Sequence, residues 1–130
     1  MITKKSPGGS NFPYYYKNGE LFGLPSGSFG SDEERVIERM KAEEKFFLGQ
    51  NRRIGLWIDF HQTRLSQKVI AEFMGSISRM GANIKKLALV GCSFTARWNL
   101  KRQIKNRLSM PIKFFDDPEE AKRWLVAEEG

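Results

Sequence analysis

His61 is the single histidine of the chain, and Asp59 precedes it by two residues. An imidazole oriented by a carboxylate can act as a general base. The sequence ties no serine or cysteine to His61, however, and a structural or solvent-facing histidine fits better. One histidine and one cysteine are too few for a zinc site built by the protein. A metal site at the neighbouring pair Asp116-Asp117 is less well supported than helix capping by Asp117, so we expect no metal and no cofactor.

Cys92 occupies a position where a thiol could act as a nucleophile. The segment Gly91-Cys92-Ser93 joins an apolar run to a predicted helix, and the free N–H groups of a helix start can hold an anion. Arg97 follows at nearly the spacing of the cysteine phosphatase loop, but that loop has five residues between cysteine and arginine and this sequence has four. A Cys92-dependent enzyme is therefore a weak alternative, with Cys92 and Ser93 as candidate anion-binding residues.

The predicted helix from about residue 94 to 107 has two unlike faces. Its buried stripe recurs at four-residue intervals: Ala96, Leu100, Ile104 and Leu108. The opposite face carries aromatic and basic side chains: Phe94, Trp98, Lys101, Arg102 and Lys105. This combination suits an acidic protein surface, a nucleic-acid backbone or an anionic lipid surface. The alternative is that Trp98 packs under a neighbouring loop and the cations only solvate the helix.

Length and composition indicate one small basic domain. The chain has 130 residues, of which 40% are hydrophobic and 12% aromatic, which excludes a wholly disordered protein. A single cysteine excludes an internal disulfide framework and favours a cytoplasmic location. No stretch approaches the roughly 18 apolar residues of a membrane span, and residues 1–11 lack the apolar core of a signal peptide.

The net charge of +7 is concentrated in the middle of the chain. Residues 51–110 hold twelve Lys/Arg against two Asp/Glu, a balance of +10, whereas residues 1–50 hold seven of each. Residues 111–130 hold three against six, a balance of −3. Such a basic region can orient an anionic partner, although it can also be a solvated face. No helix-turn-helix, aromatic RNA-binding strand motif or zinc finger accompanies it, which makes sequence-specific nucleic-acid recognition a minor alternative.

The first 48 residues are predicted to form a tail, a hairpin and a helix. Residues 1–11 are expected to be a flexible tail, and residues 12–30 an aromatic hairpin followed by a loop. Asn18-Gly19 is the predicted turn, because both residue types tolerate positive φ. The helix is expected over 31–48, with Ser31 as its N-cap and Gly49 as its end.

Strands and helices alternate over residues 53–127. Apolar runs predict strands at 54–60, 87–90 and 111–115. Helices are expected from Ser66 to Gly81, over about 94–107, and after Asp117 with Pro118 in its first position. Strands that are apolar throughout favour parallel pairing. We therefore predict an α/β fold, with residues 12–130 as one layered domain that has a mixed sheet and antiparallel hairpin strands at its edge.

The order of these segments resembles the STAS/SpoIIAA-like superfamily over roughly residues 53–127. The similarity is carried by Leu56-Trp57-Ile58-Asp59-Phe60, by Lys86-Leu87-Ala88-Leu89-Val90-Gly91-Cys92-Ser93, and by the segment from Phe114-Phe115-Asp116 to Trp124-Leu125. The resemblance implies a mixed sheet of four or five strands with helices mainly on one face. It also implies a non-catalytic bacterial regulatory module that binds a protein, and for some members a small apolar or lipid ligand.

The signalling branch of that superfamily has a phosphorylated serine in an Asp-Ser-x-Gly loop. Residues 59–68 contain neither Asp-Ser nor glycine. Thr63 and Ser66 lie in the corresponding region, but Ser66 fits an N-cap better. We expect the 59–66 loop, with Asp59, His61, Thr63 and Ser66, and the basic aromatic helix face to contact a protein partner. Non-specific nucleic-acid or anionic-membrane binding is the alternative, and a homodimer is left open.

Overall fold

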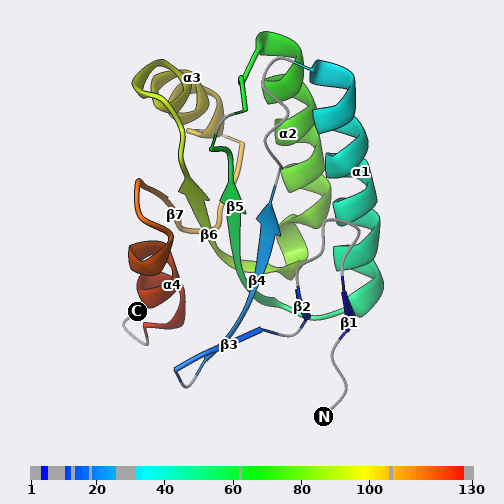
Figure 1. The fold of residues 1–130 in the computed structure, drawn as a ribbon, viewed down its shortest axis with the longest axis vertical. Coiled ribbons are helices and arrows are strands. Elements are labelled where there is room, and N and C mark those ends of the chain that lie inside the picture. Colours follow the sequence, from blue (N-terminus) through cyan, green and yellow to red (C-terminus); the bar gives the residue numbers. More distant parts are fainter. Residues whose placement is uncertain are drawn as a thin grey trace.

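The chain folds into a sheet with helices packed on both faces (Figure 1). The computed structural model describes residues 4–5, 11–12, 14–17, 19–25, 32–61, 63–105 and 107–127. Within these residues the elements are, in order, β1 (Lys4–Lys5), β2 (Asn11–Phe12), β3 (Tyr14–Tyr16), β4 (Gly19–Pro25), α1 (Glu33–Gln50), β5 (Ile54–Asp59), α2 (Gln67–Met80), the 3₁₀ turn η1 (Gly81–Asn83), β6 (Ile84–Val90), α3 (Phe94–Ile104), β7 (Ile112–Phe115) and α4 (Pro118–Val126).

The main sheet of the described residues has five strands in the order β3-β4-β5-β6-β7. Strands β4 to β7 are parallel to their neighbours, and β3 is antiparallel to β4 at one edge. Helices α1, α2 and α3 each connect two adjacent parallel strands, so the carboxyl ends of these strands lie at the same edge of the sheet. The predicted α/β domain with a mixed sheet is confirmed, although only β3 of the hairpin is antiparallel to the rest.

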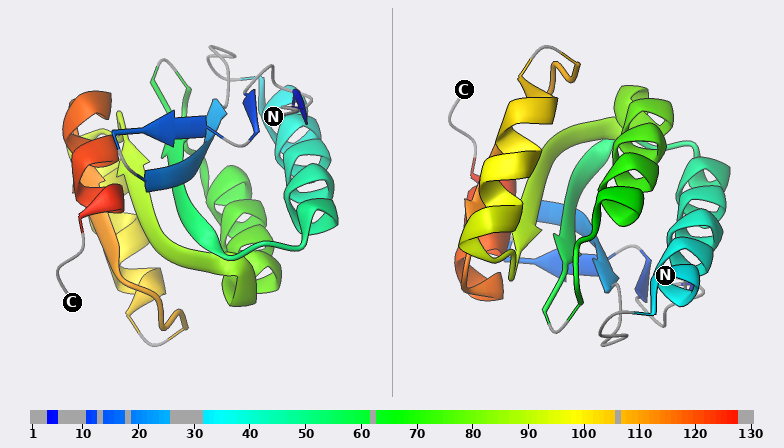
Figure 2. Two further views of the ribbon diagram at one scale, coloured as in Figure 1. Left: turned by 90° about the horizontal axis from the view of Figure 1, so that it is seen from below. Right: turned by 90° about the horizontal axis from the view of Figure 1, so that it is seen from above.

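Three helices cover one face of the sheet and α4 covers the other. The larger core joins Phe22 and Leu56 of the sheet to Phe47 of α1, with α2 and α3 packed around them. The smaller core joins Leu21 of the sheet to Leu125 of α4. Figure 2 shows α1 and α2 side by side, with α4 well apart from both. The expectation of helices mainly on one face is confirmed.

The N-terminal hairpin turns one residue earlier than predicted. Tyr16 lies opposite Gly19, which places Gly19 in β4 and starts the turn at Lys17, whose φ is 55°. A Cβ on Gly19 would lie 2.6 Å from Cγ1 of Val126. Close packing against the end of α4 therefore requires a glycine here, and the prediction that Gly19 is a turn residue is wrong. Asn18 lies outside the described residues.

Helix α1 begins and ends later than predicted. Its N-cap is Asp32, whose Oδ1 accepts a hydrogen bond from the Arg35 N–H at 3.3 Å. Ser31, the predicted cap, lies outside the described residues. The helix continues through Gly49, and Asn51 takes the left-handed conformation with φ of 54° that ends it. Asparagine adopts this conformation at helix C-termini more readily than most residues.

Two of the predicted capping residues hold the starts of α2 and α4. Ser66 Oγ accepts a hydrogen bond from the Val69 N–H at 3.2 Å, and Asp117 Oδ1 accepts one from the Glu119 N–H at 3.0 Å. Both predicted caps are confirmed. The boundaries of β6 and α3 differ, because β6 begins at Ile84 rather than at residue 87 and α3 ends at Ile104 rather than at residue 107.

The buried carboxylate of Glu44 links α1 to α2 through hydrogen bonds. Glu44 accepts hydrogen bonds from Arg79 Nε at 2.6 Å, from Arg79 Nη2 at 2.9 Å and from Ser76 Oγ at 2.8 Å. The hydrogen bonds from Arg79 hold the pKa of Glu44 below its usual value, in spite of the opposing effect of burial. The hydrophobic pattern alone gives no sign of this network, since it predicts only which side of α1 is apolar.

Part of the predicted N-terminal tail is paired. Lys4 lies opposite Phe12 and Lys5 opposite Asn11 in the antiparallel pair β1 and β2. Residues 1–3 and 6–10 of that tail lie outside the described residues. Among the helices that the structure describes, none combines the length and the apolar character needed to cross a membrane.

Candidate functional site

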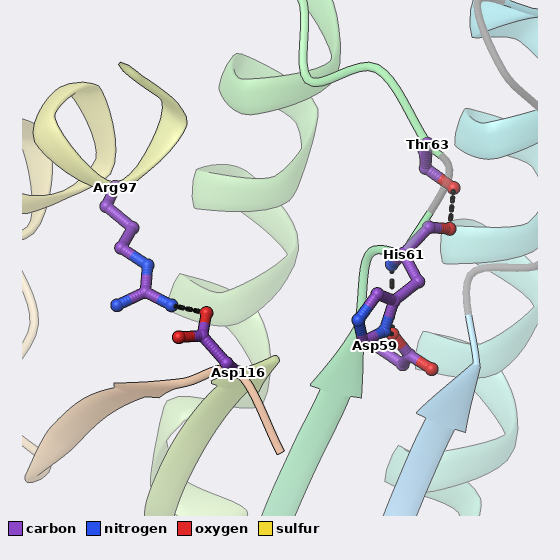
Figure 3. Close-up of polar contacts among 5 residues, drawn as sticks. All are labelled: Asp59, His61, Thr63, Arg97 and Asp116. Atoms are coloured by element: carbon purple, nitrogen blue, oxygen red, sulfur yellow. Dashed lines mark hydrogen bonds and ion pairs between the residues drawn. The ribbon is translucent and has the colours of Figure 1, made fainter. Parts of the chain in front are cut away.

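The polar residues that follow β5, β6 and β7 meet at one edge of the sheet. The Phe60 N–H donates to the Val90 carbonyl at 2.8 Å, and the Gly91 N–H donates to the Phe115 carbonyl at 3.1 Å. These bonds continue the ladders past the last strand residues and hold the three segments in register. Figure 3 shows an Asp59–His61 pair at the end of β5 and an Arg97–Asp116 pair between α3 and the end of β7.

Asp59 fixes the turn that contains His61. Its Oδ1 lies 2.7 Å from His61 Nδ1 and also accepts the His61 backbone N–H at 2.9 Å. Thr63 Oγ1 donates to the His61 carbonyl at 3.3 Å, so the hydroxyl meets the backbone and not the imidazole. The Asp59–His61 contact that the spacing allows is present, and it holds the turn in place.

Gly91 permits the close approach of His61. Its φ is +80°, and a Cβ at this position would lie 2.8 Å from Cγ and Nδ1 of His61 and 2.9 Å from the His61 backbone N. Distances this short leave no space for a side chain, and the positive φ disfavours any other residue. The end of β6 and the turn after β5 therefore touch directly through the histidine.

Cys92 is unsuited to act as a nucleophile. Its side chain belongs to the larger core, and burial raises the pKa of the thiol to about 12, although Arg97 acts in the opposite direction. The thiolate is the reactive form of cysteine, and at neutral pH it is almost absent at such a pKa. A packed cysteine, the interpretation preferred from the sequence, accounts for this position better than a catalytic one.

Arg97 ties α3 to the turn that precedes α4. Its Nη2 binds the Asp116 carboxylate, and its Nε donates to the Cys92 carbonyl at 3.3 Å. The guanidinium also lies 5.8 Å from the ring centre of Phe114. Ser93 caps α3 by accepting the Ala96 N–H at 3.2 Å. The polar atoms of Arg97 and Ser93 thus hold the helix start, and anion binding by Cys92 and Ser93 is still a prediction.

A cavity of about 450 Å³ separates the loop after β5 from the start of α3, and both segments line it. Among the predicted site residues, the structure brings Thr63, Cys92 and Ser93 together in its wall. Arg64 also lines the cavity, and the sequence analysis did not single it out. The position of Arg64 in a loop directly after a strand is the feature of the sequence that could have marked it as a site residue.

The side chains that the helical periodicity places on the outer side of α3 are exposed. Phe94 is 86% exposed and Trp98 is 56% exposed. Lys101, Arg102 and Lys105 are exposed beside them, and the Arg102 guanidinium lies 4.7 Å from the centre of the Trp98 ring. The alternative in which Trp98 packs under a loop is wrong. We call these five residues the α3 face; their contact with a partner is still a prediction.

Basic residues continue from the α3 face to the neighbouring edge strand. No aspartate or glutamate occurs between residues 73 and 115. A groove of about 370 Å³ runs between α3 and β7 and is lined by Arg97, Lys101, Ile104, Ile112, Lys113 and Phe114. The groove is not predictable from the sequence pattern, because it depends on β7 being the outer strand of the sheet. Within the described part of the chain, no group of three or more His, Cys, Asp or Glu side chains could hold a metal ion.

Comparison with known proteins identifies the family. A family model described as SpoIIAA-like matches residues 30–126. The chain belongs to the SpoIIAA-like family. The predicted resemblance is confirmed, and the match begins before α1, well ahead of the predicted start near residue 53. SpoIIAA-like domains are typically regulatory modules that interact with proteins, and they are generally not enzymes.

A solved structure shows the same SpoIIAA-like fold. It is an uncharacterized protein from the DUF3478 family, from Shewanella loihica PV-4, described as having a SpoIIAA-like fold. The two structures superpose with a TM-score of 0.60 at 17% sequence identity, over 97% of this chain and 99% of the other. The likeness therefore concerns the fold. No curated protein matches the chain.

The hydroxyl of Ser66 in this SpoIIAA-like domain forms two hydrogen bonds that stabilise the fold. Besides capping α2, its hydroxyl donates to the carboxylate of Glu33 at the start of α1. A phosphate on Ser66 would lose this bond and would lie beside the Glu33 carboxylate, where like charges repel. The geometry around Ser66 thus agrees with the absence of an Asp-Ser-x-Gly loop from the sequence.

Proposed function

We propose that this SpoIIAA-like domain is a non-catalytic regulatory module that binds a protein partner through the α3 face. The observation that carries the proposal is the exposure of Phe94 and Trp98, at 86% and 56%, on a helix whose other side is anchored in the core. Large apolar side chains exposed together mark interaction sites more often than isolated ones do.

The two aromatic side chains supply the apolar part of such a contact. Phe94 and Trp98 are four residues apart and therefore lie on the same side of α3. Complete burial of a phenylalanine side chain contributes about 1.5–3 kcal/mol. Tryptophan and arginine are enriched among the residues that dominate binding energy at interfaces. Trp98 with Arg102 above its ring is such a pair.

The charges of the α3 face select an acidic partner. Lys101, Arg102 and Lys105 are exposed, and α3 contains no acidic residue. Complementary charges accelerate association and disfavour partners of the wrong sign. The partner surface would therefore present carboxylates around an apolar centre that accepts Phe94 and Trp98.

The loop after β5 offers a second region of contact beside the first. Thr63, Arg64 and Leu65 line the same cavity as the first turns of α3. A partner that covers Phe94, the first residue of α3, would reach this loop with little extension. His61 and Asp59 contribute by fixing the turn, and Thr63 lines the cavity beside Arg64, which is the more exposed of the two.

Affinity capture with surface variants tests the proposal. Wild-type protein, the double variant Phe94→Ser/Trp98→Ser and the control Leu48→Ser are immobilised and exposed to an extract of the native cells. Leu48 is 36% exposed on α1 and matches the change in apolarity on another helix. The proposal expects a protein that wild type and Leu48→Ser retain and that the double variant loses.

Two results would overturn the proposal that the α3 face binds a protein partner. One is equal retention of every captured protein by the double variant and the wild type. The other is capture of no protein together with strongly salt-dependent binding to DNA or to acidic liposomes, which would establish the same face as a non-specific anion-binding surface.

A further inference from the structure

Within the described residues, strand β7 lies at the edge of the sheet and pairs on one side only. Its partner there is β6, with Ile112 opposite Leu87 and Phe114 opposite Leu89. The carbonyls of Pro111 and Phe115 face β6, since they accept the N–H groups of Leu87 at 2.9 Å and Gly91 at 3.1 Å.

The backbone groups of Ile112 and Phe114 face outward. Along an extended strand, successive residues direct their N–H and C=O groups to opposite sides. Because Pro111 and Phe115 face β6, the residues at alternate positions, Ile112 and Phe114, must face away from it. Each offers one donor and one acceptor to an additional strand.

The groove between α3 and β7 lies beside this edge, and its side chains would contact a strand added there. Ile112 and Phe114 direct their side chains into the core below α3, whereas Phe115 belongs to the core below α4. Lys101 lies above the Phe114 ring, with Nζ 5.6 Å from its centre. The groove thus has an apolar floor and a basic rim formed by Arg97 and Lys101 of α3. The Lys113 ammonium lies on the other face of the sheet, 5.9 Å from the centre of the Phe115 ring.

The same charges disfavour a second copy of this chain as the occupant. Pairing of two β7 edges would bring Lys113 and Lys101 of both copies together. Charged side chains, lysine above all, are the usual means by which edge strands avoid pairing with themselves. A strand that carries carboxylates removes this repulsion and replaces it with attraction.

We propose that β7 accepts an extended acidic segment of a protein partner as an added strand. The segment would pair with the N–H and C=O groups of Ile112 and Phe114, and would direct every second side chain, an acidic one, toward Lys101 on α3. The intervening side chains would be apolar and would face the side of Phe115. Strand addition of this kind obtains affinity from main-chain hydrogen bonds and specificity from alternate side chains. This inference rests on the proposed function, because it specifies the form of the acidic partner.

Hydrogen exchange with synthetic peptides tests the inference. The probes are the acetylated and amidated peptides (Glu-Val)4, (Lys-Val)4 and Glu4Val4, added to isotopically labelled protein. With (Glu-Val)4, the amides of Ile112 and Phe114 are expected to exchange more slowly, while those of Lys113 and Phe115 change little because they already bond to β6. (Lys-Val)4 is expected to have no effect, and Glu4Val4 a weaker one.

Charge reversal supplies the matched control. Lys101→Glu is expected to weaken (Glu-Val)4 binding by about threefold, since one exposed ion pair contributes about 0.7 kcal/mol. Lys41→Glu makes the same change at an exposed position on α1 and is expected to leave binding unchanged.

The outcomes separate this inference from the proposed function. No protection at Ile112 and Phe114, while cell-extract capture still depends on Phe94 and Trp98, would overturn the strand addition alone. Equal protection by (Lys-Val)4 would also overturn it. Capture that does not depend on Phe94 and Trp98 would instead overturn the proposed function.

Discussion

The guanidinium of Arg102 lies 4.7 Å from the centre of the Trp98 ring on the solvent side of α3. At exposed sites a cation in this position stabilises the pair by about 0.5–1 kcal/mol. The contact restricts both side chains before any partner arrives. Less side-chain entropy is then lost on binding, and restricted aromatic and arginine side chains are well suited to anchor an interface.

Reversal of the charges on α3 should abolish partner capture. The variant Lys101→Glu/Arg102→Glu/Lys105→Glu turns the surroundings of Trp98 from basic to acidic without touching the buried side of α3. An acidic partner would then be repelled. We expect loss of the protein that wild type captures, measured by affinity capture at a fixed protein concentration, while Lys41→Glu/Lys45→Glu retains it. Unchanged capture by the triple variant would contradict the proposed partner chemistry.

Substitution of Gly91 by alanine should destabilise the fold and displace His61. The added Cβ would meet the imidazole at 2.8 Å, and φ of +80° is unfavourable for alanine. We expect a loss of about 1–3 kcal/mol in the free energy of unfolding, measured by urea denaturation. Gly49→Ala is the control, because the Cβ that alanine adds at this position would have no atom within 4 Å and because alanine favours the helix. A Gly91→Ala variant as stable as wild type would show that the close approach of His61 is unimportant.

The Glu44–Arg79 pair should make stability depend on acid pH. Since hydrogen bonds from Arg79 lower the pKa of Glu44 in the folded protein from its ordinary value of 4.5, the stabilisation is present above that value and is lost as the pH falls through the folded pKa. Glu44→Gln should cost about 1–3 kcal/mol at pH 7, and less in acid. Thermal unfolding at several pH values measures this, with Glu38→Gln as an exposed control on α1. A cost for Glu44→Gln that does not decrease in acid would contradict this account.

Cys92 should be inert in the folded protein. With the pKa raised to about 12 by burial, the thiol stays protonated at pH 8. We expect iodoacetamide to leave Cys92 unmodified in native protein and to alkylate it fully in urea, as measured by mass spectrometry. Rapid alkylation of the native protein would revive the alternative of a reactive cysteine.

The sequence predicted those features of the fold that depend on local patterns. Ser66 and Asp117 were recognisable as caps because their side chains bond to neighbouring N–H groups. The helical period placed Phe94 and Trp98 on the outer side of α3, but whether a neighbouring loop covers Trp98 could not be predicted from it. Gly19 shows the limit of such patterns, because its role is set by contact with Val126, more than one hundred residues away.

Features that depend on tertiary arrangement escaped the sequence analysis. The end of α1 was placed at Gly49, but a glycine can continue a helix, and Asn51 provides the left-handed residue. The groove beside β7 requires knowledge of the strand order, which puts Lys113 at an edge. The bonds of Glu44 to Arg79 likewise depend on how α1 packs against α2.

Site-specific photocrosslinking from position 98 shows directly whether the α3 face contacts a protein in the cell. A benzoylphenylalanine in place of Trp98 keeps an aromatic side chain at the exposed centre of the α3 face, and the same residue in place of Leu48 probes α1. After irradiation in the native cells, we expect a discrete protein adduct from position 98 that position 48 does not form. Absence of any protein adduct from position 98, or the same adducts from both positions, would contradict it.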